Sequence, residues 1–455
     1  MKALILLSSL GVITLLAEIF SFKKVLYPIV LLGIASVLVI NGMDWNTNIT
    51  YFNMMRYDNY AVAFSGIILL VAFLWFLMSQ DFFKEESNKT DHYALVIFAL
   101  TGAILMVSYT NMSMLFLGIE ILSIPMYILA GSRKEDVLSN EAAFKYLIMG
   151  AFATGFLLFG IVLIYGATGS FDLAEIAAAV ANQTAIPSIF YVGVLLMLIG
   201  LSFKVSAVPF HFWAPDVYQG APTVITAFMS TIVKTAAFAA FLRLFSTSFA
   251  SVGTSWHQVM WIIAALTLLV GNITAVLQTS TKRMLAYSSV AHAGYMLLAL
   301  LSANNLSNSA ILMYAGAYSV ASIGTFCIIS IVDKARETDA VEAFNGLGKS
   351  NPFLAAVMTI ALLSLAGIPP TAGFFAKYYI FTSAFTAGNV GLVLLAIIAS
   401  LIGVYYYFRI IINMYFKEGS KDKIELSGNH ITLLVIVALV TIALGLFPDC
   451  LIGML

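Results

Sequence analysis

Residues 200–238 read GLSFKVSAVPFHFWAPDVYQGAPTVITAFMSTIVKTAAF, and they hold two apolar runs that each contain a lysine. Lys204 lies near the end of the first run, and Lys234 lies in the middle of the second. A break that begins at Pro209 separates the runs, because proline removes a backbone donor and clashes with the preceding helical turn. If the runs cross a bilayer, each charge costs at least about 2.5–3.5 kcal/mol, so these lysines indicate a function.

The composition of the whole chain places these runs in a membrane. The chain has 455 residues, of which 61% are hydrophobic and 10% charged, with a mean hydropathy of +0.99. Soluble globular chains are about 45–50% apolar and about 25% charged. We therefore predict a polytopic membrane protein and exclude a soluble enzyme, a disordered chain and a nucleic-acid-binding protein. The 22 basic and 22 acidic residues cancel, so no net field attracts DNA or an acidic substrate.

The apolar segments predict an all-α bundle of about fourteen transmembrane helices, because each crossing needs about 20 residues. The first segment could be a signal peptide, but no small-residue cleavage site follows it. The longest polar stretch, 333–351, is too short for a soluble domain. The expected regions are a three-helix N-terminal region at 1–90, a first five-helix repeat at 91–245, a second at 255–415, and a C-terminal helix at 428–455.

The loop charges predict the orientation of the bundle, because cytoplasmic loops carry an excess of lysine and arginine. The even-numbered loops contain only Arg56, with Arg243 at a helix end. The odd-numbered loops contain Lys23, Lys24, Lys84, Lys89, Arg133, Lys134, Lys282, Arg283, Lys334, Arg336, Lys349, Lys417, Lys421 and Lys423. We therefore expect a multi-pass protein of the inner (plasma) membrane with both termini on the outer, periplasmic side.

Five ionisable residues fall within the expected helices and are the candidate site residues. They are Glu120, Lys204, Lys234, His292 and Lys377. Ion pairs that lock the bundle together are one interpretation, but the lysines outnumber their acidic partners. A buried lysine near a carboxylate can gain and lose a proton close to neutral pH. We therefore predict a proton or cation relay, in which His292 is either a member or a core histidine.

Two of the expected helices are interrupted, the seventh after Lys204 and the twelfth at residues 367–373, just before Lys377. Interruptions at membrane depth are tolerated where protein or water satisfies the freed backbone groups. Because the breaks lie five helices apart, the two five-helix bundles would run in opposite directions. This arrangement is typical of the inverted repeats of ion transporters.

The sequence contains no pattern typical of a redox or metal site. Cys327 and Cys450 have no CxxC spacing, and neither a GxGxxG nor a Walker motif occurs. We expect no cofactor and no metal in this chain. A membrane enzyme that acts on lipid or glycan is a third functional class, for which His211 with Asp216 is the best catalytic pair.

Four segments resemble a known family of membrane proteins. Residues 200–238 closely resemble the core of the proton-translocating antiporter-like subunits of complex I, the bacterial NADH–quinone oxidoreductase. The run FLAAVMTIALLSLAGIPPTAGFFAKYYIF at 353–381 resembles the second-half signature of the same family. NEAAFKYLIMGAFATG at 140–155 and TKRMLAYSSVAHAGYM at 281–296 are also similar. The resemblance covers roughly residues 90–415.

The resemblance implies a role for each candidate residue. Glu120 would partner Lys204, Lys234 would be the central relay lysine, and His292 with bound water would link the two halves. Lys377 would pass protons toward the outer side. NADH oxidation and quinone reduction would take place in other subunits, so this chain would be a pump module without a cofactor.

The resemblance also implies partners and leaves an alternative function open. The expected partners are the other membrane and peripheral subunits of complex I, especially further antiporter-like subunits, together with membrane lipid and no nucleic acid. The alternative is a subunit of a multi-subunit cation/proton antiporter, which shares the fold and the lysines. The transported ion, H⁺ or Na⁺, is not fixed by the residues, although lysines suit protons better.

Overall fold

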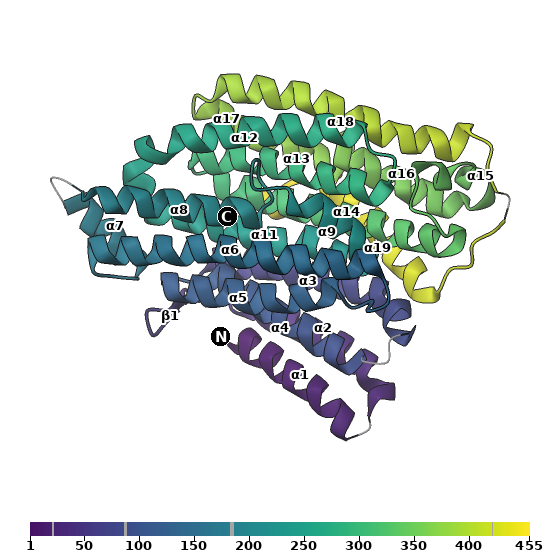
Figure 1. Cartoon of the computed structure of the whole chain (residues 1–455), viewed down its shortest axis with the longest axis horizontal. Coiled ribbons are helices and arrows are strands. Elements are labelled where there is room, and N and C mark those ends of the chain that lie inside the picture. Colours follow the sequence, from purple (N-terminus) through teal and green to yellow (C-terminus); the bar gives the residue numbers. More distant parts are fainter. Residues whose placement is uncertain (21, 86–88, 183–185, 421) are drawn as a thin grey trace.

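The computed structural model describes residues 1–20, 22–85, 89–182, 186–420 and 422–455, and the side chains of Lys84 and Glu85 are outside the description. Its helices lie side by side with their axes roughly along the length of the molecule (Figure 1). The N-terminal helices form one flank and α18 forms the opposite flank. The protein is therefore a helical bundle, as predicted, and Lys421 of the expected cytoplasmic loops lies outside the described residues.

The N-terminal region contains three helices and a small hairpin. Its elements are α1 (Lys2–Ile19), the 3₁₀ turn η1 (Lys23–Val25), α2 (Leu26–Met43), β1 (Ile49–Tyr51), β2 (Met55–Tyr57) and α3 (Asn59–Glu85). The two strands pair antiparallel with Ile49 opposite Tyr57. They form the only sheet among the described residues.

The next part of the chain contains the helices of the first expected repeat. They are α4 (Lys89–Ser108), α5 (Met112–Ala130), α6 (Val137–Thr168), α7 (Leu173–Asn182), α8 (Ser188–Lys204), α9 (Trp213–Gly220), α10 (Thr223–Phe228), the π-helix η2 (Met229–Val233) and α11 (Lys234–Thr247). Side-chain caps fix the starts of two of them, because Asn111 accepts the amide of Ser113 and Asp136 accepts that of Leu138, each at 2.9 Å.

The remaining helices fill the second half of the chain. They are η3 (Ala250–Val252), α12 (Gly253–Val276), α13 (Thr281–Ser302), α14 (Ser307–Arg336), η4 (Val341–Phe344), α15 (Leu347–Ser350), α16 (Pro352–Ala366), α17 (Ala372–Thr386), α18 (Val390–Phe416), α19 (Gly428–Leu446) and α20 (Asp449–Ile452). Ser280 caps α13 by accepting the amide of Arg283. Lys282, which the sequence assigns to a loop, is therefore in the first turn of a helix.

Among the described residues, 12 helices are long and apolar enough to cross a membrane. The two other expected crossings are shorter helices in the structure. One coincides with α8, which ends at a lysine, and the other coincides with the pair α16 and α17, which is interrupted beside a lysine. α8 ends at Lys204 and the chain becomes helical again only at Trp213. α16 ends at Ala366 and α17 begins at Ala372. These shorter helices explain the difference between the predicted number of crossings and the number of long helices.

Freed backbone groups at both interruptions find partners within the protein. The amide of Val208 donates to the hydroxyl of Thr267 at 2.9 Å, and the Trp213 indole donates to the carbonyl of Phe203 at 3.1 Å. At the second interruption, the amide of Gly373 donates to the hydroxyl of Ser364 at 3.1 Å. Such pairing is what allows irregular backbone inside an apolar bundle.

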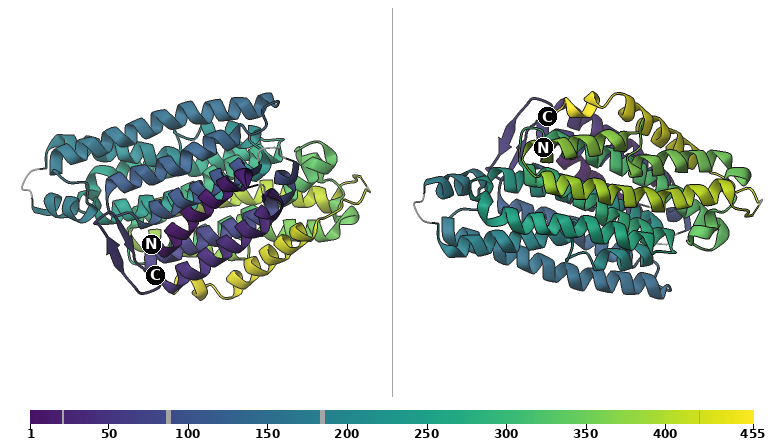
Figure 2. Two further views of the ribbon diagram at one scale, coloured as in Figure 1. Left: turned by 90° about the horizontal axis from the view of Figure 1, so that it is seen from below. Right: turned by 90° about the horizontal axis from the view of Figure 1, so that it is seen from above.

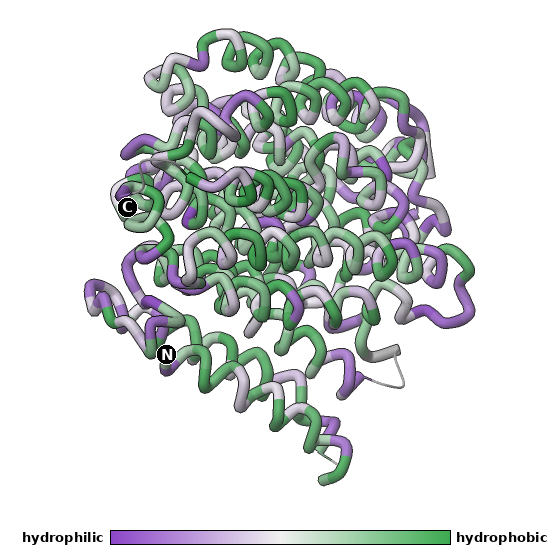
Figure 3. Tube along the Cα trace, turned by 60° about the vertical axis from the view of Figure 1, so that its left-hand side comes forward, coloured by the Kyte–Doolittle hydropathy of each residue, from purple (hydrophilic) through white to green (hydrophobic). Residues whose placement is uncertain are grey.

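Burial separates a central layer of helices from an outer layer. The segment α10–η2–α11 is buried except near its C-terminal end, where Ser246 and Thr247 are exposed, and α13 and α14 are almost entirely buried. By contrast, α1, α2 and α19 expose most of their apolar side chains, as do one face of α6 and one of α18. Apolar residues dominate the middle of the helices, and polar residues gather at their ends and loops (Figure 3). The outer surface is thus suited to lipid or to other membrane subunits.

Both termini lie at the same end of the bundle. The N-terminal ammonium is 3.7 Å from the carboxylate of Asp44, which follows α2. Leu451 and Met454 line a cavity together with Trp45, the residue after Asp44. Figure 2 shows the two termini at the same position along the length of the bundle, and Figure 1 shows them separated across it. The chain therefore starts and ends on one side, which is consistent with an even number of crossings.

Candidate functional site

Lys204 is held at the C-terminal end of α8 by two hydroxyl groups of α5. Its side chain is 6% exposed, and its ammonium donates to Ser123 at 2.8 Å and to Tyr127 at 3.4 Å. The ammonium also lies 5.8 Å from the centre of the Tyr127 ring, a cation–π distance. Among the described residues, no carboxylate lies within ion-pair distance of Lys204.

Glu120 lies on the same face of α5, one turn before Ser123 and two turns before Tyr127. Its side chain is half-buried at the flank of the bundle, where it lines a cavity of about 480 Å³ between α5 and α6. Tyr127 lines the same cavity and also contacts Lys204. Tyr127 therefore lies beside both residues, and no ion pair between Glu120 and Lys204 is present among the described residues.

Lys234 is the first residue of α11 and follows directly on the π-helix η2. It is 1% exposed, and its ammonium donates to the backbone carbonyl of Ser289 on α13. This is the hydrogen bond that the structure gives it. A single turn of π-helix in a membrane helix is a frequent mark of a functional position.

His292 lies three residues beyond Ser289 on α13 and is bonded through both ring nitrogens. Its Nδ1 is 2.7 Å from the hydroxyl of Tyr314, and its Nε2 is 3.0 Å from the hydroxyl of Tyr407. Tyr407 in turn contacts the hydroxyl of Ser288. The ring is therefore part of a chain of hydroxyl groups. The sequence leaves open whether His292 is a member of the relay or a core histidine.

Lys377 on α17 lies against the second interruption. Its ammonium donates to the carbonyl of Ala366 at 2.7 Å and to the hydroxyl of Ser400 at 2.8 Å. Gly367 adopts φ +83°, and a Cβ there would lie 2.7 Å from Cδ of Lys377. Only glycine accommodates both the left-handed backbone and the close approach of the lysine. The end of α16 is thus shaped around this side chain.

A small cavity joins His292 to Lys377. Its volume is about 10 Å³, close to the space that one water molecule requires. Tyr314, Tyr318 and Ser364 contribute polar groups to its lining. A water here could bond the ammonium of Lys377 and the hydroxyl of Tyr314, which contacts Nδ1 of His292, so the cavity connects the two titratable side chains through that tyrosine.

A charged cluster at one end of the bundle joins α6, α9 and α13. The ammonium of Lys145 is 2.6 Å from Glu141 and 2.6 Å from Asp216, and Arg283 lies 2.8 Å from the other oxygen of Asp216. Partial burial acts to raise the pKa of Asp216, but hydrogen bonds from Lys145 and Arg283 hold it below its usual value. Glu141 and Lys145 form an i, i+4 pair on α6, and Asp216 extends this pair into a link between helices.

The structure thus brings Lys234, His292 and Lys377 into one row and leaves Lys204 with Glu120 in a second group nearby. The groups that sequence reasoning missed are hydroxyls, chiefly Ser123, Tyr314 and Tyr407, because serine and tyrosine are common in membrane helices. A helical spacing from Glu120 could have pointed to Ser123. No comparable signal identifies Tyr314 or Tyr407, because they lie on other helices, α14 directly after α13 and α18 much later in the chain.

The segment that holds all five candidate residues matches a family model. Residues 109–403 match the model described as NADH:quinone oxidoreductase/Mrp antiporter, TM. NADH-quinone oxidoreductase subunit N of Cytophaga hutchinsonii is 48% identical, and the alignment covers 99% of this chain and 98% of that protein. Subunit N of Flavobacterium psychrophilum is 43% identical over 100% of both chains.

Solved structures share the fold along the whole chain. A chain of respiratory complex I from Thermus thermophilus has a TM-score of 0.85 and 32% identity, covering 99% of this chain and 98% of that chain. A chain of the Mrp complex from Dietzia sp. DQ12-45-1b has a TM-score of 0.88 and 19% identity, covering 100% of this chain and 96% of that chain. At that lower identity, the second likeness concerns the fold alone.

Proposed function

Because the chain belongs to the NADH:quinone oxidoreductase/Mrp antiporter family of membrane subunits, we propose that its buried lysines carry protons across the membrane. The family model covers more than half of the chain, and relatives named NADH-quinone oxidoreductase subunit N match it from end to end. The chain is thus a proton-translocating membrane subunit of an NADH–quinone oxidoreductase. Its partners are the other subunits of that complex.

One observation carries the proposed route, the row of polar groups through an otherwise apolar core. Lys234 contacts the carbonyl of Ser289, the neighbouring Ser288 contacts Tyr407, and Tyr407 contacts His292. A hydroxyl both donates and accepts, and a neutral imidazole accepts at one nitrogen while it donates at the other. Ser288, Tyr407 and His292 can therefore pass protons among themselves without movement of the helices, whereas the step from Lys234 needs a water beside the carbonyl of Ser289, because a backbone carbonyl only accepts.

The second part of the route runs from His292 to Lys377. The small cavity between them supplies the place for a water, and a proton that reaches Lys377 faces the broken end of α16. The carbonyl of Ala366 and the hydroxyl of Ser400 stabilise the protonated form. Lys377 is therefore the terminal carrier in our proposal, from which protons leave toward the outer side.

Lys204 and Glu120 act as the element that sets the charge state of the relay. Ser123 and Tyr127 solvate the ammonium of Lys204, and Glu120 lines the same flank cavity as Tyr127. A change in the charge of Glu120 therefore alters the electrostatic field at Lys204 across a short distance in a medium of low dielectric constant. We propose that a neighbouring subunit signals to the relay through this residue.

We also propose that the subunit carries no redox cofactor, and that NADH oxidation and quinone reduction take place elsewhere in the complex. Two cysteines at 327 and 450 are too few and too far apart in the chain for an iron–sulfur cluster. The lysine-rich loops support an orientation with both termini on the periplasmic side of the inner membrane. Lysine carriers favour H⁺ over Na⁺, because sodium would need a cage of oxygen ligands.

The test replaces the central carrier and measures proton movement directly. Complex with Lys234→Ala is purified, checked for assembly on a native gel, and reconstituted into liposomes with wild-type complex as reference. NADH-driven proton uptake is followed with a pH-sensitive dye and divided by the NADH oxidised. Loss of a relay group slows proton transfer by about 10²–10⁴-fold, so we expect the share of uptake contributed by this subunit to disappear.

A matched control removes a lysine outside the route. Lys349 is exposed on α15, and Lys349→Ala should pump like wild type. Lys204→Ala and Glu120→Gln should also lower uptake, because each disturbs the charge next to the relay. Normal uptake by an assembled Lys234→Ala complex would overturn the proposal.

A further inference from the structure

A fourth buried lysine among the described residues has no part in the route proposed above. Lys282 is 7% exposed, and its ammonium donates to the carbonyl of Ala221 at 3.1 Å. It lies in the first turn of α13, where the helix dipole opposes a positive charge. Both burial and the dipole therefore favour the neutral amine, which makes this position a poor choice for a permanent structural charge.

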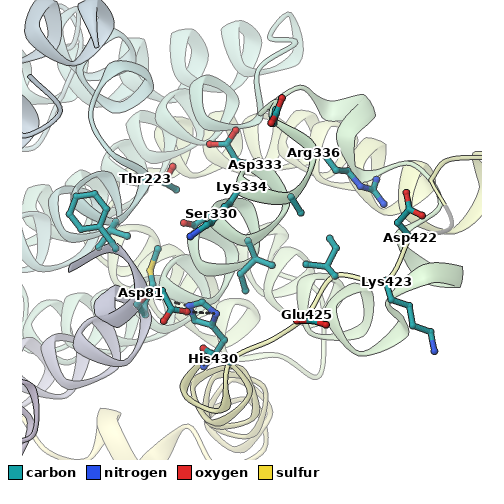
Figure 4. Close-up of a pocket in the computed structure, with 18 of the residues that line it drawn as sticks. Asp81, Thr223, Ser330, Asp333, Lys334, Arg336, Asp422, Lys423, Glu425 and His430 are labelled. Atoms are coloured by element: carbon teal, nitrogen blue, oxygen red, sulfur yellow. Dashed lines mark hydrogen bonds and ion pairs between the residues drawn. The ribbon is translucent and has the colours of Figure 1, made fainter. Parts of the chain in front are cut away.

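A large polar cavity opens at the same end of the bundle. Its volume is about 740 Å³, enough for roughly twenty water molecules. Charged side chains of both signs surround it (Figure 4), namely Asp81, Arg133, Asp333, Lys334, Arg336, Glu337, Asp422, Lys423, Glu425 and His430. Most come from the lysine-rich loops that we assign to the cytoplasmic side. The cavity is therefore a place where bulk water enters the bundle.

Lys282 lies directly behind the wall of this cavity. Thr223 lines the cavity and is two residues beyond Ala221, the carbonyl partner of Lys282. Asp333 also lines the cavity, and its charge acts on Lys282 electrostatically. The lysine is thus within one layer of residues of the water-filled space, while its own side chain is buried.

The interval between Lys282 and Lys234 contains buried hydroxyl groups. On α13, Lys282 and Ser289 lie on one face about 10 Å apart, and Ser289 is the residue whose carbonyl binds Lys234. The hydroxyls of Thr281, Ser289 and Tyr218 are buried without a hydrogen bond of normal geometry in the described part of the chain, and those of Ser289 and Tyr218 lie close enough to interact. Buried hydroxyls almost always have a partner, and water is the usual one where protein offers none.

We propose that the cavity is the inlet of the proton relay and that Lys282 is its first carrier, which supplies Lys234 along the hydroxyls of Thr281, Tyr218 and Ser289. The proposal rests on the proposed function, because it assigns the side from which the central lysine is loaded. It adds a residue and a cavity that the relay of Lys204, Lys234, His292 and Lys377 does not include.

The proton transfer balances at each step. A hydronium in the cavity gives a proton to the neutral amine of Lys282, so an N–H bond forms as an O–H bond breaks and water remains. The ammonium then releases a proton to the next water or hydroxyl along the path. That proton ends on the neutral amine of Lys234, and Lys282 returns to its neutral form.

The decisive variant keeps the charge and removes the ability to release it. Lys282→Arg retains a cation that can bond the carbonyl of Ala221, but guanidinium does not give up its proton in proteins. We expect the assembled complex to lose as large a share of NADH-driven proton uptake as Lys234→Ala loses. Lys423→Arg on the exposed rim of the same cavity is the matched control and should pump like wild type.

The results separate this inference from the proposed function. If Lys234→Ala loses uptake and Lys282→Arg does not, Lys282 is a structural cation and the inlet proposal is overturned while the relay stands. If Lys234→Ala itself pumps normally, the proposed function fails first. Loss in both variants supports both proposals.

A second measurement covers the possibility that Lys282→Arg does not assemble. Thr223→Cys is introduced together with Cys450→Ser, which removes the exposed native thiol, whereas Cys327 is buried. A charged, membrane-impermeant methanethiosulfonate is then added from each side of oriented membrane vesicles. We expect reaction from the cytoplasmic side only, with loss of proton uptake. Reaction without loss of uptake, or no reaction from that side, would overturn the inlet.

Discussion

At the scale of single residues, His292 is the buried titratable group whose surroundings best suit the carrier role that we propose for it. Its two ring nitrogens face hydroxyls from two different helices, Tyr314 on α14 and Tyr407 on α18. A buried neutral imidazole needs a partner at both nitrogens, one as donor and one as acceptor, and these two hydroxyls supply them. Because each hydroxyl can donate or accept, a proton can reach the ring from one tyrosine and leave it toward the other.

Tyr407→Phe tests this path with the smallest change available, since it removes one hydroxyl and keeps the ring. The Nε2 of His292 loses its partner, which costs about 1–3 kcal/mol for a buried polar group. We expect slower proton uptake per NADH oxidised, together with a lower apparent melting temperature. Tyr405→Phe is the control, because Tyr405 is exposed two residues away. Equal uptake in the two variants would exclude Tyr407 from the relay.

At the scale of elements, the helix that carries Lys234 is distinguished by its π-helical turn. Met229–Val233 form η2 between α10 and α11, and the segment α10–η2–α11 is buried except near its C-terminal end. The wider turn leaves α-helical hydrogen bonding locally disturbed directly before the lysine. The N-terminal end of this segment is bonded to a neighbouring helix, since the indole of Trp75 on α3 donates to the carbonyl of Val224 at 2.7 Å. The position of Lys234 is therefore determined by the packing of its helix rather than by an ion pair with a carboxylate.

An ion pair with Asp58 fixes the C-terminal end of the segment α10–η2–α11. Both oxygens of Asp58, which precedes α3, accept hydrogen bonds from Arg243 on α11, at 2.8 and 3.0 Å. Burial acts to raise the pKa of Asp58, but Arg243 and the amide of Ala61 hold it below its usual value. A carboxylate whose pKa is lowered in the folded protein stabilises the fold at pH values above its ordinary pKa, near 4. This stabilisation is lost as the pH falls below that value.

Asp58→Asn should therefore destabilise the protein at neutral pH by about 1–3 kcal/mol, the usual contribution of hydrogen bonds to charged groups. The difference from wild type should shrink as the pH falls below about 4, where wild-type Asp58 becomes protonated as well. Apparent melting temperatures in detergent at several pH values measure both effects. Asp91→Asn, an exposed position at the start of α4, should show little change at any pH. A difference that stays constant down to pH 3 would argue against the carboxylate as the cause.

At the scale of the whole molecule, Glu120 and the exposed apolar side chains of α6 form a surface suited to contact with another membrane subunit. Glu120 opens to a cavity at the flank between α5 and α6, and α6 exposes several large apolar side chains beside it. A carboxylate at membrane depth is disfavoured against lipid. A neighbouring membrane subunit that supplied a polar or positive group there would satisfy it.

Assembly into the large complex is the corresponding prediction. The tagged protein, extracted with a mild detergent, should migrate on a native gel with a large assembly that stains for NADH dehydrogenase activity. This follows from its full-length likeness to subunits of NADH–quinone oxidoreductase. Migration with a few small membrane partners and no such activity would favour the multi-subunit antiporter instead.

Much of this protein could be predicted from its residues. The apolar runs require helices because backbone polar groups inside a bilayer must bond within their own segment. Lys204, Lys234 and Lys377 were recognised because charge in such runs is costly and therefore informative. The glycine and proline positions likewise predicted where α16 would end, since the left-handed backbone at Gly367 excludes other residues.

The contacts among these groups depended on the tertiary structure. Lys282 was expected in a loop, the resemblance implied that Glu120 partners Lys204, and nothing in the sequence linked Tyr407 to His292. Hydroxyl groups carry no signal in an apolar sequence, and a helix start displaced by a few residues turns a loop lysine into a buried one. Charge and hydropathy are local properties of the chain, whereas a hydrogen bond between α13 and α18 exists only after both helices have packed.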